Sequence, residues 1–167
     1  MTRTLVTYVY YESDVSKLNF DFFVQNGIHK RNDVHYNIIV KSDKCSIQIP
    51  KLDNVTVYKT KNEGRCWGGF AYSINQINKN YFDKFIFMND TVIGPFLPSY
   101  KNKNDWVNIF TSMLSDKIKM IGSTRNNHIY KENGRNITPH IQSMNIAVDK
   151  IGLKILINNN KLNLDKT

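Results

Sequence analysis

A short polar motif, Asn89-Asp90-Thr91, directly follows the apolar run Phe85–Met88. It offers an amide oxygen, a carboxylate and a hydroxyl in succession. Mg²⁺ and Mn²⁺ prefer such oxygen ligands and often take only one or two carboxylates, with phosphates supplying other positions. Asn and Asp are equally typical of a turn that ends a strand. From these three residues alone, a metal site and a plain turn both stay open.

Three glycines, Gly64, Gly68 and Gly69, lie where a strand is expected to pass into a helix. Free N–H groups at a helix N-terminus bind phosphate or sugar, and Arg65 between them can pair with a diphosphate. A loop with a close helix contact is the simpler explanation of the same glycines.

The stretch "NITPHIQSMNIAVD", residues 136–149, carries His140 and Asp149. Histidine is the usual proton carrier near neutral pH and also binds metals, although a lone histidine is more often structural. The polar residues Gln142 and Ser143 after it indicate a binding loop. Asp149 can act as a general base, or it can cap a helix.

The bulk composition favours one globular domain. The chain has 167 residues, of which 41% are hydrophobic, and a formal net charge of +9. A basic chain attracts polyanions, including nucleotide diphosphates, acidic glycans and nucleic acids. The cations are scattered, however, and no nucleic-acid-binding motif is recognisable, so a basic nucleic-acid-binding α/β module is the weaker alternative.

Two cysteines are too few for a disulfide scaffold and favour a reducing compartment. No segment approaches the roughly 20 apolar residues of a membrane helix, and the N-terminus lacks a signal-peptide pattern. We therefore expect a soluble cytoplasmic protein. We expect one domain over residues 1–157 and a frayed polar tail over 158–167.

Apolar periodicity and β-branched runs predict the elements that position these residues. Strands are expected over 5–10, 34–42, 54–60, 84–88 and 117–123. Helices are expected from Ser13 or Asp14 to Gly27, from Gly68 onward, and over 106–114, while 140–158 is ambiguous at its start and then helical. This alternation indicates an α/β fold with a mostly parallel central sheet flanked by helices. Ligands bind such sheets at the carboxyl ends of the strands, which is where Asp90 is expected.

Several ordered stretches between Val6 and Leu153 resemble the GT-A type glycosyltransferases, which use nucleotide sugars. Within that type, the chain is most similar to a family from large DNA viruses and bacterial polysaccharide loci. The stretches are "VYYES", "NFDFFVQNGI", "NVTVYKTKNEGRCWGGFAYSI", "FIFMNDTVIGPFLP", "GSTRNN" and "PHIQSMNIAVD". The fourth and sixth are the most specific.

The resemblance implies a GT-A fold with a metal motif of DXD type at Asn89-Asp90-Thr91. Asp90 would bind Mn²⁺ or Mg²⁺, which neutralises the diphosphate leaving group of a donor such as a UDP-sugar. The motif has one carboxylate where a full DXD has two. The resemblance also implies a set of donor contacts: Tyr10, Tyr11, Glu12, Arg65, Gly68, Gly69, Asn89 and Asp90.

On the acceptor side, the resemblance implies His140 as base or metal ligand. Asp149 is a second candidate for the base. The residues implied to contact the substrate are Thr91, Arg125, Gln142 and Ser143. The implied partners are a nucleotide-sugar donor and a glycan acceptor. A catalytically silent nucleotide-sugar binder stays open, because one carboxylate of the motif is missing.

Overall fold

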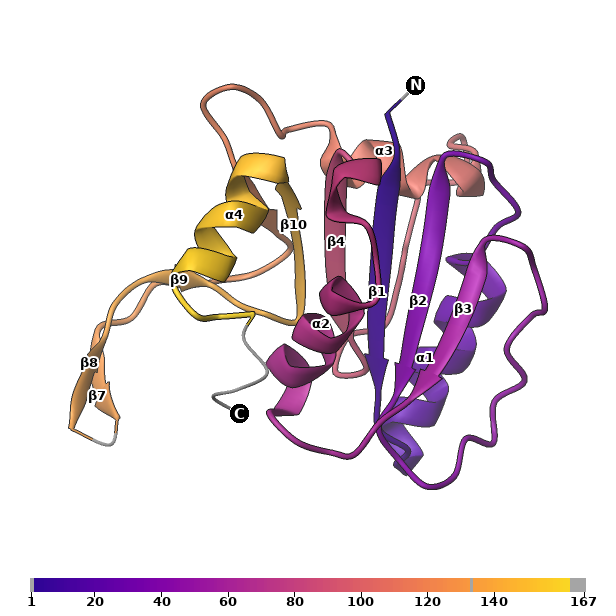
Figure 1. Ribbon diagram of the computed structural model, residues 1–167, viewed down its shortest axis with the longest axis horizontal. Helices are drawn as coiled ribbons and strands as arrows, with labels where there is room; N and C mark the ends of the chain where they lie inside the picture. The colour runs from indigo at the N-terminus through magenta and orange to yellow at the C-terminus, as the bar shows by residue number, and fades with distance from the viewer. Residues whose placement is uncertain (1, 133, 163–167) are drawn as a thin grey trace.

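The computed structural model describes residues 2–132 and 134–162, which form an α/β fold around one large sheet (Figure 1). The sheet contains β1 (Thr4–Tyr10), β2 (Val34–Val40), β3 (Val55–Lys59), β4 (Lys84–Asn89), β5 (Met120–Gly122) and β10 (Asn145–Asp149). The helices are α1 (Asp14–Asn26), α2 (Arg65–Asn75), α3 (Trp106–Thr111) and α4 (Lys150–Asn158). Short 3₁₀ turns, η1 (Lys79–Tyr81) and η2 (Lys103–Asp105), precede β4 and α3.

The strand order is β3-β2-β1-β4-β10-β5. Strands β1 to β4 are parallel to one another, whereas β10 is antiparallel to both β4 and β5. The chain moves outward from β1 to β3 and then returns to β4 on the other side of β1, so the strand order reverses between β1 and β4. Ligands of open α/β sheets bind at such a reversal.

Two small ladders lie beside the large sheet. Strand β6 (Arg125–Asn126) pairs with β9 (His140–Ile141), and β7 (Tyr130–Glu132) pairs with β8 (Arg135–Ile137). Figure 1 shows the β7–β8 ladder extending away from the rest of the fold.

Helices cover both faces of the sheet, each over its own apolar core. On one face, Phe20 and Phe23 of α1 and Trp106 of α3 are buried against Tyr8 and Tyr36 of the sheet. The other face is covered by α2 and α4, whose buried residues Phe70, Ala71, Ile74, Leu153 and Leu156 pack on alternate strand residues. A central strand covered on both faces is expected to be continuously apolar, as Phe85–Met88 of β4 are.

Each predicted helix and strand is present, but several differ in extent, and the short strands β6, β7 and β8 were not predicted. Helix α2 begins at Arg65 rather than near Gly68, and the fifth strand is confined to Met120–Gly122. The ambiguous segment 140–158 contains two strands, β9 and β10, before α4. The expected tail also differs, because Leu162 is 5% exposed and belongs to the core under α4. The remainder of that tail, 163–167, lies outside the described residues.

Helix α1 buries only one of its faces. Phe20 and Phe23 lie on the buried face. Leu18 and Val15, although apolar, are 71% and 68% exposed. Ser13 caps the helix as predicted, forming a capping box with Ser16.

Helix α2 lies unusually close to β1 because Gly69 faces Val9. A Cβ atom on Gly69 would lie 2.5 Å from Val9 Cγ2, a distance that real Cβ atoms essentially never show. Gly69 was predicted to bind the donor. It is buried at the helix–strand contact, so its role is close packing and the predicted contact is wrong.

The first prediction follows from this contact. Gly69→Ala should lower the free energy of unfolding by about 1–3 kcal/mol, because the added methyl overpacks the contact with Val9. Urea denaturation measures the change. In a Val9→Ala background the same substitution should be less destabilising, since the colliding Cγ atoms are gone. Equal penalties in the two backgrounds would contradict the proposed clash.

Candidate functional site

The tips of β1 and β4 are joined by the Asp90 carboxylate. Asp90 Oδ2 accepts a 2.6 Å hydrogen bond from Tyr11 N–H, and Asp90 N–H donates to Val9 O at 3.2 Å. Asn19 of α1 donates to Asp90 O at 2.8 Å. The residue is therefore held by β1 and α1 at the point where the strand order reverses. No hydrogen bond to Oδ1 comes from the described residues, which leaves this oxygen available.

Asn89 stands where a second carboxylate would complete the motif, but its side chain is engaged locally. Its Oδ1 accepts hydrogen bonds from the Thr91 N–H, at 3.1 Å, and from the Thr91 hydroxyl. Asn89 itself is 7% exposed. It was predicted to contact the donor; its oxygen instead stabilises the turn that presents Asp90, so the predicted contact is wrong.

The environment of Asp90 disfavours its charged form. Desolvation by burial raises the pKa of this carboxyl above its ordinary value, and the Tyr11 N–H bond offsets only part of that effect. A half-buried carboxylate with a free oxygen, and with no ion-pair partner among the described residues, is an expected place for a positive ligand.

The first turn of α2 lies beside this tip. Gly68 N–H donates to Gly64 O at 2.8 Å, which is the first bond of the helix. The N–H groups of Arg65, Cys66 and Trp67 precede it, and no side chain caps them. Such a turn attracts anions. Gly68 was predicted to bind the donor; its N–H is used within the helix, and a Cβ there would lie 2.3 Å from Glu63 O, so close packing already requires this glycine.

Lys41 positions this turn from the end of β2. Its Nζ donates to the backbone oxygens of Glu63 and, at 2.6 Å, of Arg65. Lys41 is 5% exposed, and burial lowers the pKa of its ammonium group. Lys41 was not among the predicted site residues. Its place directly after β2 was the signal that could have identified it.

A basic cavity opens at the carboxyl ends of β1, β2 and β3. Its volume is about 590 Å³. The lining includes the side chain of Tyr11, which is 49% exposed, and the exposed cations Lys59 and Lys61. Both lysines were absent from the predicted site, since each alone resembles any surface lysine.

Two residues predicted near this cavity have structural roles. Tyr10 is fully buried and its ring stacks on Phe20 at 4.4 Å, so it cannot contact a ligand base. The Glu12 carboxylate accepts a 2.6 Å hydrogen bond from Ser46 N–H, which lowers the pKa of Glu12 and holds the loop after β2. The predicted base contact of Tyr10 is therefore wrong, the contact of Glu12 stays a prediction, and the available aromatic face is that of Tyr11.

A second cavity, of about 650 Å³, lies on the other side of the first turn of α2. Its lining is apolar at Trp67, Met144 and Leu156 and polar at a few positions, among them His140, Gln142 and Ser143. Cys66 Sγ and Ser143 Oγ are 3.7 Å apart, and Asn89 N–H donates to Met144 O at 3.1 Å. The predicted residues Gln142 and Ser143 thus lie near the end of β4 that carries Asp90.

The β6–β9 ladder presents the remaining polar residues. Arg125 pairs with Ile141, and Asn126 pairs with His140. Arg125 and His140 are both exposed. His140 Nδ1 lies 2.7 Å from Thr138 O. Since a carbonyl can only accept, Nδ1 carries the proton, and the neutral ring has its free lone pair on Nε2.

Asp149 is placed far from Asp90 by the direction of β10. In the antiparallel register, Asn145 faces Met88 near the tip of β4, whereas Asp149 faces Lys84 at its start. Met88 and Lys84 are four strand steps apart, about 13 Å. Asp149 was predicted as a catalytic base. This prediction is wrong because Asp149 lies beside the start of β4, at the opposite end of the strand from Asp90.

Asp149 instead caps α4. Its Oδ1 accepts from Gly152 N–H at 2.8 Å, and its Oδ2 pairs with Lys119 Nζ at 2.8 Å. Burial opposes its ionisation, but the bonds from Gly152 and Lys119 outweigh burial and hold the pKa of Asp149 below its ordinary value.

The described residues fit a cation only as part of a larger ligand set. Among them, no three His, Cys, Asp or Glu side chains cluster closely enough to hold a metal by themselves. Asp90 Oδ1 can supply one ligand, and the free oxygens of a diphosphate can supply others. The arrangement therefore suits a metal that arrives with a phosphate ligand rather than one bound permanently by protein.

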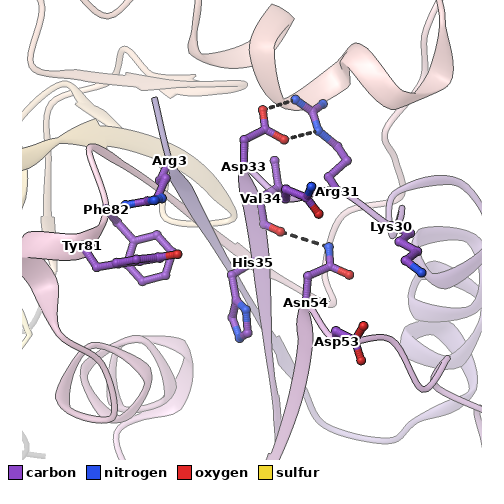
Figure 2. A pocket seen from close by; sticks show the side chains of 11 residues that line it. Arg3, Lys30, Arg31, Asp33, Val34, His35, Asp53, Asn54, Tyr81 and Phe82 are labelled. Carbon is purple, nitrogen blue, oxygen red and sulfur yellow. Dashed lines mark hydrogen bonds and ion pairs between the residues drawn. The ribbon is translucent and has the colours of Figure 1, made fainter. Parts of the chain in front are cut away.

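A third cavity lies at the opposite end of the strands, around the starts of β1 and β2 (Figure 2). It measures about 250 Å³. Figure 2 shows the Arg31 guanidinium paired with Asp33, and Arg3 lies 4.1 Å over the Tyr81 ring. None of the predicted site residues lines this cavity. Its paired and stacked charges are explained by packing of the strand starts.

The pKa of Asp90 is raised by folding and that of Asp149 is lowered, and each shift leads to a prediction. Because folding raises the pKa of Asp90, the folded state loses stability as pH rises from the unfolded value, about 3.9, through the folded pKa. Asp90→Asn removes this loss and keeps an acceptor for Tyr11 N–H. The variant should therefore melt at a higher temperature than wild type at neutral pH, with the difference shrinking near pH 4. Asp43→Asn, at an exposed position, is the control; a lower melting temperature for Asp90→Asn would contradict the prediction.

The second concerns Asp149. Asp149→Ala should destabilise the fold by about 1 kcal/mol through loss of the helix cap, or about 2–4 °C in melting temperature. Because folding lowers the pKa of Asp149, the wild-type advantage should be present above about pH 4 and disappear as the pH falls through the folded pKa. Melting curves of both proteins across this range measure it. A penalty that stays constant into acid would show that the carboxylate charge contributes nothing.

No protein-family model matches the sequence, and no curated protein matches it. Among solved structures, the fold is similar to the apo structure of the bifunctional glycosyltransferase WbbM, with a TM-score of 0.49 and 10% sequence identity. The match covers 96% of this chain and 33% of that one, so the chain spans about a third of its neighbour. A likeness at this level assigns no activity, and function has to be argued from the site.

Proposed function

We propose that this chain is a metal-dependent glycosyltransferase of GT-A type. It would move a sugar from a nucleoside diphosphate, most simply UDP, to a hydroxyl of a glycan. The observation that carries the proposal is the position of Asp90. Its carboxylate lies where the strand order reverses, and the uncapped first turn of α2 nearby lies between a basic cavity and an apolar one.

The basic cavity suits the nucleotide part of the donor. Tyr11 offers an exposed aromatic face on which a base can stack. Lys59 and Lys61 contribute positive charge at the same place. The diphosphate would then extend toward the free N–H groups of the first turn of α2, with the exposed Arg65 guanidinium beside them.

Asp90 would hold the metal through Oδ1, with Thr91 next to it. A bound Mn²⁺ or Mg²⁺ supplies charge neutralisation for the departing diphosphate. The Tyr11 N–H bond keeps the carboxylate oriented, and burial strengthens its attraction for a cation. The missing second carboxylate is consistent with a metal that binds together with the donor.

The apolar cavity suits the acceptor. Trp67 in its wall can pack on the face of a sugar ring. Gln142 and Ser143 can bind hydroxyls, and the exposed Arg125 lies on the adjacent ladder. With Nδ1 bound to Thr138 O, the neutral His140 ring can accept a proton at Nε2 from the attacking hydroxyl.

A thermal unfolding assay tests the donor and metal together. UDP with Mn²⁺, at about 100 times the dissociation constant, should stabilise the fold by about 2.7 kcal/mol. Asp90→Ala should lose this stabilisation and lose hydrolysis of UDP-sugars. Asp149→Ala, at the opposite end of the strands, should keep UDP-sugar hydrolysis. It should also keep the stabilisation by UDP with Mn²⁺, measured against the melting temperature of the same variant without ligand.

Each other outcome has a distinct meaning. No metal-dependent shift with UDP or with other nucleotides would overturn the proposal. Metal-dependent binding without turnover of any donor would identify a catalytically silent nucleotide-sugar binder. Salt-sensitive binding to DNA or RNA with no nucleotide effect would favour the nucleic-acid-binding alternative.

A further inference from the structure

The outer face of α1 is apolar and lacks a covering element among the described residues. Val15 and Leu18 are 68% and 71% exposed, and Phe22 follows one turn later. At 100° per residue these three side chains fall within an arc of about 60°. Phe96, from the loop after β4, extends the stripe, since it is 66% exposed and its ring lies 4.8 Å from that of Phe22. We call these four residues the α1 face.

Scattered exposed apolar residues are normal, but a contiguous stripe of this kind marks an interaction surface. The inner side of the same helix already supplies Phe20 and Phe23 to the core. Apart from the Phe22–Phe96 contact, the outer stripe therefore lies outside the core of this chain. Hydrophobic residues that avoid the core at regular helical spacing indicate that a second surface covers them.

Charge is distributed unevenly along the α1 face. Asp14 stands at the N-terminal end of the helix, and the neighbouring Lys17 lies close to the Glu12 carboxylate. At the C-terminal end, Lys103 Nζ is 3.3 Å from Asn26 Oδ1, and Lys101 lines the groove beside Phe22. The stripe is thus acidic at one end and basic at the other. The two ends are about 18 Å apart, as 12 helical steps require.

We propose that the α1 face is the interface of a homodimer, in which two α1 helices pack antiparallel across a two-fold axis. A two-fold axis places each patch against its own copy, so the patch must be self-complementary. Antiparallel helices bring Asp14 of one protomer to Lys103 of the other, twice, while the apolar stripes meet in the middle. A surface with both signs fits a second copy better than an anionic membrane, which would repel Asp14 and Asp21.

The dimer would also support the candidate site. Asn19 of α1 donates to Asp90 O, and the chain runs from Asp90 through the loop that carries Phe96. Covering Phe96 would therefore fix both ends of the segment that begins at the tip of β4. The proposal itself does not depend on glycosyl transfer, because it rests only on the α1 face.

Sedimentation velocity across about 1 μM to about 1 mM, the usual span of modest affinities, tests the proposal. Wild type should shift from monomer toward dimer within this range. Leu18→Asp should remain monomeric throughout, because it places a charge in the middle of the stripe. Ile155→Asp, an equally radical change at a 51% exposed position of α4, should behave as wild type.

A charge exchange tests the antiparallel arrangement. Asp14→Lys and Lys103→Asp should each weaken association roughly tenfold, because each turns two attractive contacts per dimer into repulsive ones. The double variant should restore association. Parallel helices, or a different patch, would leave the double variant no better than the sum of its parts.

Several results would overturn the proposal. Wild type that stays monomeric throughout, or Leu18→Asp that still dimerises, would do so. If Leu18→Asp is misfolded by circular dichroism, Val15→Asp takes its place with the same expectation. Wild type that is monomeric but co-sediments with phosphatidylserine vesicles, and loses this with Leu18→Asp, would assign the α1 face to a membrane surface instead.

Discussion

The pairing of β4 with β1 on one side and β10 on the other decides which side chains meet at the candidate site. The parallel ladder with β1 brings the strand tips together, so that Tyr11 N–H reaches the Asp90 carboxylate. The antiparallel ladder with β10 brings the start of that strand, beside Met144, to the same tip. These two ladders bring Tyr11, Asp90 and Met144 together at the tip of β4. The second ladder also places Asp149 at the other end of β4.

The first turn of α2 depends on this arrangement in turn. Gly69 lets the helix approach β1 at a distance that no larger residue would allow. Lys41 then binds the carbonyl groups at the start of the helix and leaves its N–H groups uncapped. The result is an anion-attracting turn beside a buried carboxylate that attracts cations. A metal bound to a phosphate ester suits this arrangement, because the metal can bind the Asp90 carboxylate and the phosphate can bind the N–H groups of α2.

The site also has a cost in stability. Burial raises the pKa of Asp90, so its ionised form is held against a desolvation penalty. Natural proteins commonly keep such destabilising groups where ligands bind, because the ligand relieves the penalty. The exposed stripe on α1 is a comparable feature on the surface. The first is a carboxylate held against a desolvation penalty, and the second is apolar surface left exposed to solvent.

Sequence alone determined the fold class and most of the elements. Alternating β-branched runs and helical periodicities predicted the parallel strands, and the apolar run before Asp90 correctly indicated a strand covered on both faces. The Ser13 cap was also readable, because capping depends on neighbours in the chain. These features are local, and local interactions leave a local pattern.

Tertiary structure decided the roles of individual residues. Tyr10 and Tyr11 are adjacent in sequence, yet one is buried and the other exposed, because helices cover both faces of β1 and the strand ends at Tyr10. Gly68, Gly69 and Asn89 have the right types for ligand contacts and are used for packing and turn formation instead. Asp149 was separated from Asp90 by the direction of β10, a strand that periodicity did not reveal. Residue type and spacing record what a side chain can do, whereas long-range pairing and burial, which no local pattern encodes, decide what it meets.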